Sequence, residues 1–168
     1  MSYRNKTYVA FDADTDMHYY RIMQAWKEND KIDFDFHNAH ELNNIMIWSS
    51  EETIKRRLRE RLNNTKYFIL LIGKHTKSLY QFVRWEIEVA INMDIPIICA
   101  NLSGKKTMDA DLCPSILQKH LALHIKFGIK PIKHALDTWT PVYIKSQKDL
   151  GKIGPYFLPE SVYKGFGQ

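Results

Sequence analysis

Four short apolar runs stand out along the N-terminal part of the chain. They are rich in β-branched and aromatic residues and span residues 7–11, 32–36, 67–72 and 95–101. Such runs are typical of β-strands, and they are apolar almost throughout rather than alternating, so they predict strands that are buried on both faces. Strands of this kind belong to parallel sheets that helices cover on both sides.

The stretches between the runs have the spacing of amphipathic helices. Residues 16–29 place large apolar side chains at helical intervals, which predicts the first helix. Three residues could cap its start: Asp14, Thr15 and Asp16. A second helix is predicted from Ser49, which has capping-box spacing to Glu52, and a third between residues 79 and 93.

The alternation of strands and helices predicts an α/β fold with a central, mostly parallel sheet. Residues 121–127 can supply a fifth strand and residues 131–139 a short helix, before an aromatic-rich tail at residues 151–168. The usual strand order of such a five-stranded sheet is 2-1-3-4-5, and ligands bind where this order reverses, beyond the carboxyl ends of the first and third strands. Topology therefore selects two loops, residues 12–16 and residues 73–80.

One carboxylate does not fit its predicted surroundings. On a helical wheel of residues 82–93, Glu86 falls inside the apolar face. That face consists of Phe82, Val89, Ala90 and Met93. Arg84 and Glu88 lie on the polar side with the i, i+4 spacing of a surface ion pair.

Two interpretations of Glu86 follow from the wheel. A carboxylate on an apolar face is costly unless it is hydrogen-bonded or takes part in chemistry. As a structural group, Glu86 would cap backbone amides or pair with a buried cation such as Arg21 or Lys74. As a functional group, it would act beside the loop at residues 73–80 that topology selects.

Composition narrows the class of protein. The 168 residues carry 24 Lys and Arg against 19 Asp and Glu, a formal net charge of +5, and 45% are hydrophobic. These values predict one domain with its own core and exclude collagen, intrinsic disorder and a disulfide miniprotein. No apolar run has the length of a signal peptide or a membrane span, so a cytoplasmic protein without membrane contact is expected. Cys99 is expected to be a small buried hydrophobe.

Other candidate sites are weaker. His37 with His40, and His120 with His124, have spacings that a metal could use, but no third ligand stands with them, so no metal is expected. The basic cluster at residues 55–61 is diluted by acidic and apolar core positions, which favours a solvated helix surface over a nucleic-acid site. The third strand lacks a phosphoacceptor aspartate at its end, which excludes a receiver domain, and neither a P-loop nor a Rossmann glycine motif occurs.

Three segments carry a recognisable family pattern. They are residues 6–16, residues 67–76 and the run Val83-Arg84-Trp85-Glu86-Ile87. These segments resemble the prokaryotic TIR-like domains, and most of all the TIR subunits of Thoeris anti-phage systems. The resemblance implies a flavodoxin-like three-layer fold with the strand order given above. It spans residues 6–101 as the core of a single domain over residues 1–168, and leaves residues 102–168 as a C-terminal elaboration.

The resemblance also implies an activity. Catalytic members of the TIR family cleave the nicotinamide–ribose bond of NAD, and they release nicotinamide with ADP-ribose or a cyclised form of it. Thoeris members make a cyclic ADP-ribose isomer that activates a partner effector. The family's catalytic glutamate falls on Glu86. NAD is then a substrate and no cofactor is expected; the implied partners are NAD or a related dinucleotide, a second TIR domain, and an effector that senses the product.

The chemistry of this reaction suits a single carboxylate. Nicotinamide leaves as a neutral molecule because its pyridinium ring is already cationic, so no general acid is needed. Glu86 would stabilise the positive charge that develops on the ribose. Candidate substrate-binding residues around it are Phe11, Asp12, Asp14, Gly73, Lys74, Thr76 and Arg84. The predicted loop after the second strand contains three residues that would shape the cleft or mediate assembly: His37, His40 and Asn43.

Two alternative functions stay open. In a non-catalytic TIR interaction module, Glu86 would be structural and the loop at residues 37–48 would mediate homotypic contacts. A nucleoside deoxyribosyltransferase-like enzyme would also use a carboxylate on this type of sheet at a ribose carbon. Deoxynucleosides tested beside NAD would separate the two enzyme classes.

Overall fold

The computed structural model describes residues 6–29, 35–38, 49–78 and 81–168. Strands and helices alternate along this part of the chain, and further helices follow the fifth strand. In chain order the elements are β1 (Lys6–Ala10), α1 (Met17–Glu28), β2 (Asp35–Asn38), α3 (Glu51–Leu62), β3 (Tyr67–Ile72), η2 (Thr76–Ser78), α4 (Phe82–Asn92), β4 (Ile97–Asn101), η3 (Ser115–Leu117), β5 (Leu123–Lys126), α5 (Ile129–Thr138), α6 (Pro141–Asp149), β6 (Tyr156–Phe157) and α7 (Glu160–Gly165).

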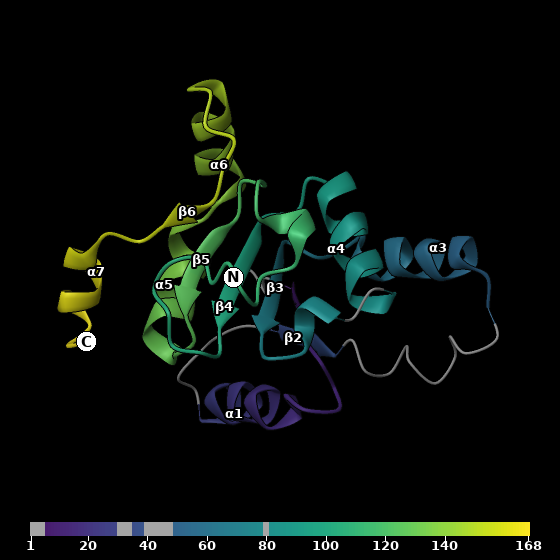
Figure 1. The fold of residues 1–168 in the computed structure, drawn as a ribbon, viewed down its shortest axis with the longest axis horizontal. Helices are drawn as coiled ribbons and strands as arrows, with labels where there is room; N and C mark the ends of the chain where they lie inside the picture. Colours follow the sequence, from purple (N-terminus) through teal and green to yellow (C-terminus); the bar gives the residue numbers. More distant parts are fainter. Residues whose placement is uncertain (1–5, 30–34, 39–48, 79–80) are drawn as a thin grey trace.

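A parallel sheet runs through the centre of the molecule (Figure 1). In the described residues its order is β2-β1-β3-β4-β5-β6, and each neighbouring pair of strands is parallel. The predicted α/β class and the order of the first five strands are confirmed. The sixth strand corrects the predicted number of strands, because the two residues of β6 are too few to leave a periodic pattern in the sequence.

The second strand differs in position from the prediction. β2 occupies Asp35–Asn38 rather than residues 32–36, of which residues 32–34 lie outside the described part of the chain. His37 therefore lies within the strand, in register with Tyr8 of β1, and not in the loop that follows.

The start of the second helix is also shifted by one residue. Ser50, and not Ser49, is the N-cap of α3, because Ser50 has an extended backbone and its hydroxyl accepts a hydrogen bond from the Thr53 amide at 3.3 Å. A serine at either position satisfies the sequence rule for a cap, so the pattern alone does not choose between them. The inward face of this helix consists of Ile54, Leu58 and Leu62, which are all buried.

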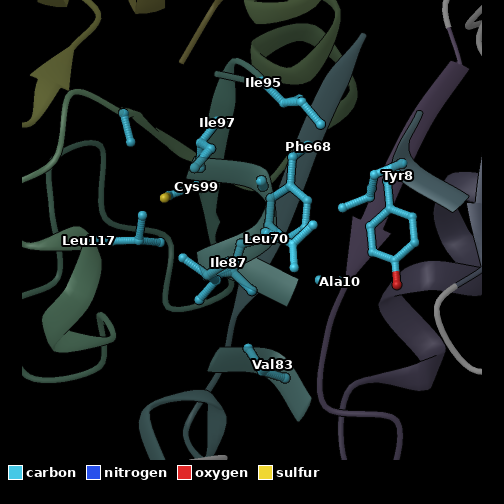
Figure 2. Close-up of a cluster of buried hydrophobic side chains, with 14 of the residues drawn as sticks. Tyr8, Ala10, Phe68, Leu70, Val83, Ile87, Ile95, Ile97, Cys99 and Leu117 are labelled. Atoms are coloured by element: carbon cyan, nitrogen blue, oxygen red, sulfur yellow. The ribbon is translucent and has the colours of Figure 1, made fainter. Parts of the chain in front are cut away.

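Helices cover both faces of the sheet, as apolar strands require. Alternate residues of a strand point to opposite faces. Tyr8, Phe68 and Cys99 belong to the core layer that α3 and α4 cover, whereas Val9 and Ile69 belong to the layer that α1 and α5 cover. Figure 2 shows the first layer, with Tyr8 at its margin and the Tyr8 hydroxyl oxygen directed away from the aliphatic side chains. Cys99 is fully buried there, as predicted.

The C-terminal elaboration is partly packed and partly projecting. α7 is held by Tyr163, whose buried hydroxyl accepts a hydrogen bond from the Lys126 amide at 3.1 Å, and by an ion pair between Lys106 and Glu160 at 3.0 Å. α6 projects beyond the sheet (Figure 1). It and the segment after it carry the most exposed large apolar side chains of the described residues: Val142, Leu150 and Ile153.

Candidate functional site

Glu86 is buried on the inner face of α4. Only 4% of it is exposed, and the apolar residues buried with it on this helix are Val83, Ile87, Val89 and Ala90. The Tyr8 hydroxyl donates a hydrogen bond to Glu86 Oε1 at 3.0 Å. The burial predicted for Glu86 is confirmed, but the partner is a neutral tyrosine of β1 and not a cation such as Arg21 or Lys74.

Burial sets the protonation of this Tyr8–Glu86 pair. Removal from water raises the pKa of Glu86 to about 7, although the hydrogen bond from Tyr8 and the charge of Arg61 on α3 both lower it. Burial first, and the Glu86 carboxylate second, raise the pKa of the Tyr8 phenol well above its ordinary value. The phenol therefore keeps its proton at neutral pH, while the Glu86 carboxyl gains and loses its proton in that range. A carboxyl with these properties is a candidate for chemistry.

Asp12 organises the β1–α1 loop. Its Oδ1 accepts a hydrogen bond from the Asp14 amide at 3.0 Å, and its Oδ2 accepts one from the Thr15 hydroxyl at 2.7 Å. Asp16 is the N-cap of α1, one of the predicted caps, but it makes no capping bond through its side chain. Burial first, and the Asp12 carboxylate second, raise the pKa of Asp16. Both oxygens of Asp12 are thus engaged in holding the loop.

Thr76 fixes the β3–α4 loop in the same way. The Gly73 amide donates a hydrogen bond to Thr76 Oγ1 at 2.9 Å, and the Thr76 hydroxyl donates to the Leu71 carbonyl at 3.3 Å. Thr76 is buried, while Lys74 between the two bonded positions is exposed. The Gly73 amide and the Thr76 hydroxyl therefore shape this loop, and Lys74 is an exposed cation on it.

The two loops meet where Gly73 approaches Asp16. A Cβ atom placed on Gly73 would lie 2.2 Å from Asp16 Oδ2, so Gly73→Ala must displace the carboxylate or the loop. We expect this substitution to lower the free energy of unfolding by about 1–3 kcal/mol, the usual cost of overpacking. Urea denaturation measures the loss.

The matched control for this prediction is Gly154→Ala. A Cβ atom there meets nothing within 4 Å, and Gly154 is not among the glycines with positive φ. It should leave the midpoint of unfolding nearly unchanged. Equal effects of the two substitutions would contradict the proposed contact between Gly73 and Asp16.

A pocket of about 340 Å³ lies at the carboxyl ends of β1, β3 and β4. The described residues that line it come from the β1–α1 loop and α1, the β3–α4 loop and the segment after β4: Thr15, Asp16, His18, Tyr19, Gly73, Lys74, His75, Leu102, Ser103 and Leu112. Both loops that topology selects contribute to this pocket. Glu86 is not among these lining residues.

Comparison with protein families decides the relationship of the chain. The family model described as Thoeris protein ThsB, TIR-like domain, matches residues 8–107. The chain belongs to this family. The match begins at Tyr8 and contains Glu86 together with both loops of the pocket, and it ends before η3, so β5 and every later element lie outside it.

In this member of the family, the candidate substrate residues lie in several different environments. Gly73 and Lys74 line the pocket. Phe11 is buried in the opposite core layer, where its ring stacks on Tyr20 of α1 at 5.0 Å between centroids. Arg84 lies on the outer side of α4, and its Nε is 2.9 Å from Glu88 Oε1, which confirms the predicted surface pair. His40 and Asn43 fall outside the described residues.

Sequence reasoning missed several pocket residues of this family member. His18 and Tyr19 lie in the first turn of α1, and Ser103 follows β4. Ligands bind beyond the carboxyl ends of parallel strands, and Ser103 follows the fourth strand, which lies beside the third. The same rule could therefore have predicted Ser103 as a pocket residue. His18 carried no signal, because a histidine at the start of an exposed helix turn is common in any fold.

The basic cluster of α3 and the buried histidine of β5 do not line this pocket. Lys55 of the basic cluster on α3 is ion-paired with Glu51 and with Glu88, at 2.8 Å in each case. His124 is fully buried in β5. Within the described ranges, no three side chains of metal-binding type are gathered. None of the helices in those ranges is both long and apolar enough to cross a membrane.

Proposed function

We propose that this Thoeris-type defence protein is an NAD-processing enzyme that cleaves the nicotinamide–ribose bond and yields ADP-ribose or a cyclic isomer of it. One observation carries the proposal: Glu86 is a buried carboxyl with a pKa raised to about 7, on the helix that follows the β3–α4 loop, and it accepts a hydrogen bond from the neutral Tyr8 hydroxyl. A carboxyl in this state can be ionised at neutral pH and carries little hydration that substrate would have to displace.

The reaction requires little from the protein beyond this carboxylate. The bond between ribose C1′ and the pyridinium nitrogen breaks, and its electron pair neutralises the ring as nicotinamide departs. Positive charge develops on the ribose, and ionised Glu86 stabilises it. Water, or a hydroxyl of the adenosine ribose, then forms the new bond at C1′ and loses its proton.

The burial of Glu86 also bears on regulation. With 4% of Glu86 exposed, a ribose reaches the carboxylate only after neighbouring groups move aside. The enzyme is therefore expected to be weakly active alone and to gain activity when a trigger, or self-association with another TIR domain, favours an open form. An effector that senses the product would complete the defence response.

The pocket at the carboxyl ends of β1, β3 and β4 is proposed to receive the anionic part of the dinucleotide. Lys74 is the exposed lysine among the described residues that line this pocket. We expect Lys74→Gln to raise the KM for NAD by about tenfold with little change in kcat, because an exposed charge contributes mainly to binding. Lys77→Gln, which removes an exposed lysine of the same loop that does not line the pocket, is the control. An unchanged KM for Lys74→Gln would remove the pocket from the proposed site.

The direct test is to incubate the purified protein with NAD, alone and with an extract of phage-infected cells, and to follow nicotinamide by chromatography. Deoxynucleosides with a free base form a parallel assay. Nicotinamide release supports the proposal. Transfer of deoxyribose between bases, with NAD left intact, would assign the chain to the deoxyribosyltransferase-like class instead.

The non-catalytic alternative has one observation in its favour. A structural carboxyl would also be buried and hydrogen-bonded to a core side chain, as Glu86 is to Tyr8. That alternative expects no reaction with NAD under any condition, and a loss of stability when Glu86 is replaced. The stability of the Glu86 variant therefore separates the two functions.

A further inference from the structure

We propose that Tyr8 is the positioning residue of Glu86: its hydroxyl fixes the Oε1 oxygen of the carboxyl and favours the ionised form that the reaction uses. This inference rests on the proposed function and adds a second residue to it. Tyr8 acts through Glu86 and has no assigned contact with the substrate.

The position of Tyr8 makes its hydroxyl a rigid donor. Tyr8 is fully buried in β1, and its backbone lies in register with His37 of β2 on one side and Phe68 of β3 on the other. Its ring stacks on Phe68 with 5.6 Å between the centroids and 15° between the planes. The phenol oxygen can therefore move little, and Glu86 Oε1, 3.0 Å away, is fixed with it.

The hydroxyl has no role in the packing of the apolar core. A phenylalanine would stack on Phe68 with nearly the same shape, and a buried hydroxyl without a partner costs free energy. Within the described part of the chain, this hydroxyl is hydrogen-bonded to the Glu86 carboxyl. The hydroxyl is thus explained by the carboxylate that it contacts.

Among the described residues, Tyr8 and Arg61 from neighbouring elements act on the charge of Glu86. Tyr8 from β1 donates a hydrogen bond and Arg61 from α3 contributes a positive charge, and both lower the pKa of Glu86 against the larger effect of burial. A hydrogen bond to an ionised group is stronger than one to a neutral group, so Tyr8 favours the carboxylate over the acid.

The test is the pH profile of Tyr8→Phe. The ionised form of Glu86 is the active one, so wild-type kcat/KM should rise with pH through about 7, the pKa of Glu86. In Tyr8→Phe this rise should move upward by about one pH unit, which lowers kcat/KM about tenfold on the acidic side and restores most of it at high pH. A merely structural loss would lower activity by the same factor at every pH.

Tyr163→Phe is the matched control. Tyr163 is also fully buried, and its hydroxyl accepts a part-buried hydrogen bond from the Lys126 amide of β5. This variant loses a comparable bond outside the region of Glu86, so its pH profile should coincide with that of wild type. A profile that shifts equally in both variants, or in neither, would overturn the role of Tyr8.

A second measurement does not depend on activity. The pKa of Glu86 can be followed by NMR of carboxyl-labelled glutamate, with Glu86→Gln identifying the resonance. A higher Glu86 pKa in Tyr8→Phe supports the positioning role, and an unchanged pKa overturns it. A wild-type protein that never releases nicotinamide contradicts the proposed function instead, and the NMR titration still decides the coupling between Tyr8 and Glu86.

Discussion

Replacing Glu86 by glutamine is expected to reduce nicotinamide release by at least a factor of about 100, while making the protein more stable above neutral pH. The loss of activity follows because glutamine carries no charge to stabilise the ribosyl cation, and removal of one preorganised electrostatic group typically costs a factor of about 100–1,000. Nicotinamide assays at saturating NAD, on wild type and variant side by side, measure the effect.

The gain in stability follows from the raised pKa of Glu86. Its ordinary pKa is 4.5 and its value in the folded protein is about 7, so the folded state binds the proton more tightly than the unfolded state does. Glu86 therefore contributes stability below about pH 4.5, and that contribution is lost as the pH rises through 7. Glutamine keeps an acceptor for the Tyr8 hydroxyl and avoids the buried charge. We expect roughly 1–2 kcal/mol more stability near pH 8, after the cost of burying the amide.

The two readouts together decide between enzyme and interaction module. A structural carboxylate would give the opposite sign, a loss of stability on replacement. Glu88→Gln on the same helix is the control, because Glu88 is held by Lys55 and Arg84 at the surface, which lower its pKa. It should retain activity and lose a little stability. Wild-type nicotinamide release by Glu86→Gln would contradict the assignment of Glu86 as the catalytic residue.

The second large effect is expected from His124, which should make the folded protein less stable at low pH. This side chain is fully buried beside Phe157, and neither ring nitrogen has a hydrogen-bond partner in the described residues. Burial lowers its pKa from 6.5 to about 4. The unfolded state then binds more protons between these values, so the stability that neutral His124 allows is lost as the pH falls from 6.5 to below 4. The loss amounts to about 3 kcal/mol.

Replacing His124 by leucine should remove this loss. The stability difference between His124→Leu and wild type, measured by urea denaturation at a series of pH values, is expected to grow steadily from about pH 6.5 down to pH 4. At neutral pH the variant should be at least as stable as wild type, because leucine buries no unpaired nitrogen. A difference that stays constant with pH would show that His124 is already charged, or already hydrated, in the folded protein.

Glu86 and His124 act in opposite directions over the same range. Between about pH 4.5 and 6.5, acidification stabilises the folded state through Glu86 and destabilises it through His124, by similar amounts per pH unit. In the wild-type protein, their contributions to the pH dependence of the free energy of unfolding nearly cancel in this range. Each single variant removes one of the two slopes and makes the other visible, whereas the double variant should again show little net slope.

The sequence predicted best what local pattern controls. β3 occupies the predicted residues 67–72, because the limits of a purely apolar run determine where the strand begins and ends. The burial of Glu86 followed from helical spacing alone. In contrast, α6 was missed, although Thr140 caps it by accepting a hydrogen bond from the Tyr143 amide and Pro141 stands at its start. A helix with almost no buried face leaves only its cap as a signal.

The contacts that define the candidate site cannot be predicted from local sequence patterns. Tyr8 and Glu86 are 78 positions apart in the chain, and only the packing of α4 against β1 brings them together. The approach of Gly73 to Asp16 likewise depends on how two loops cross at the end of the sheet. Both contacts are tertiary, so neither leaves a trace in local spacing or composition.

The strands β5 and β6 change how the family-matched segment can exist. β4 lies between β3 and β5, and all five of its residues are buried. A chain that stopped at the end of the family match would turn β4 into an edge strand, with its backbone hydrogen-bonding groups and apolar side chains open to other molecules. Edges of that kind promote aggregation, and native proteins cover or charge them. In the described structure β5 and β6 therefore border the sheet beside β4, and we expect the matched segment expressed without them to aggregate.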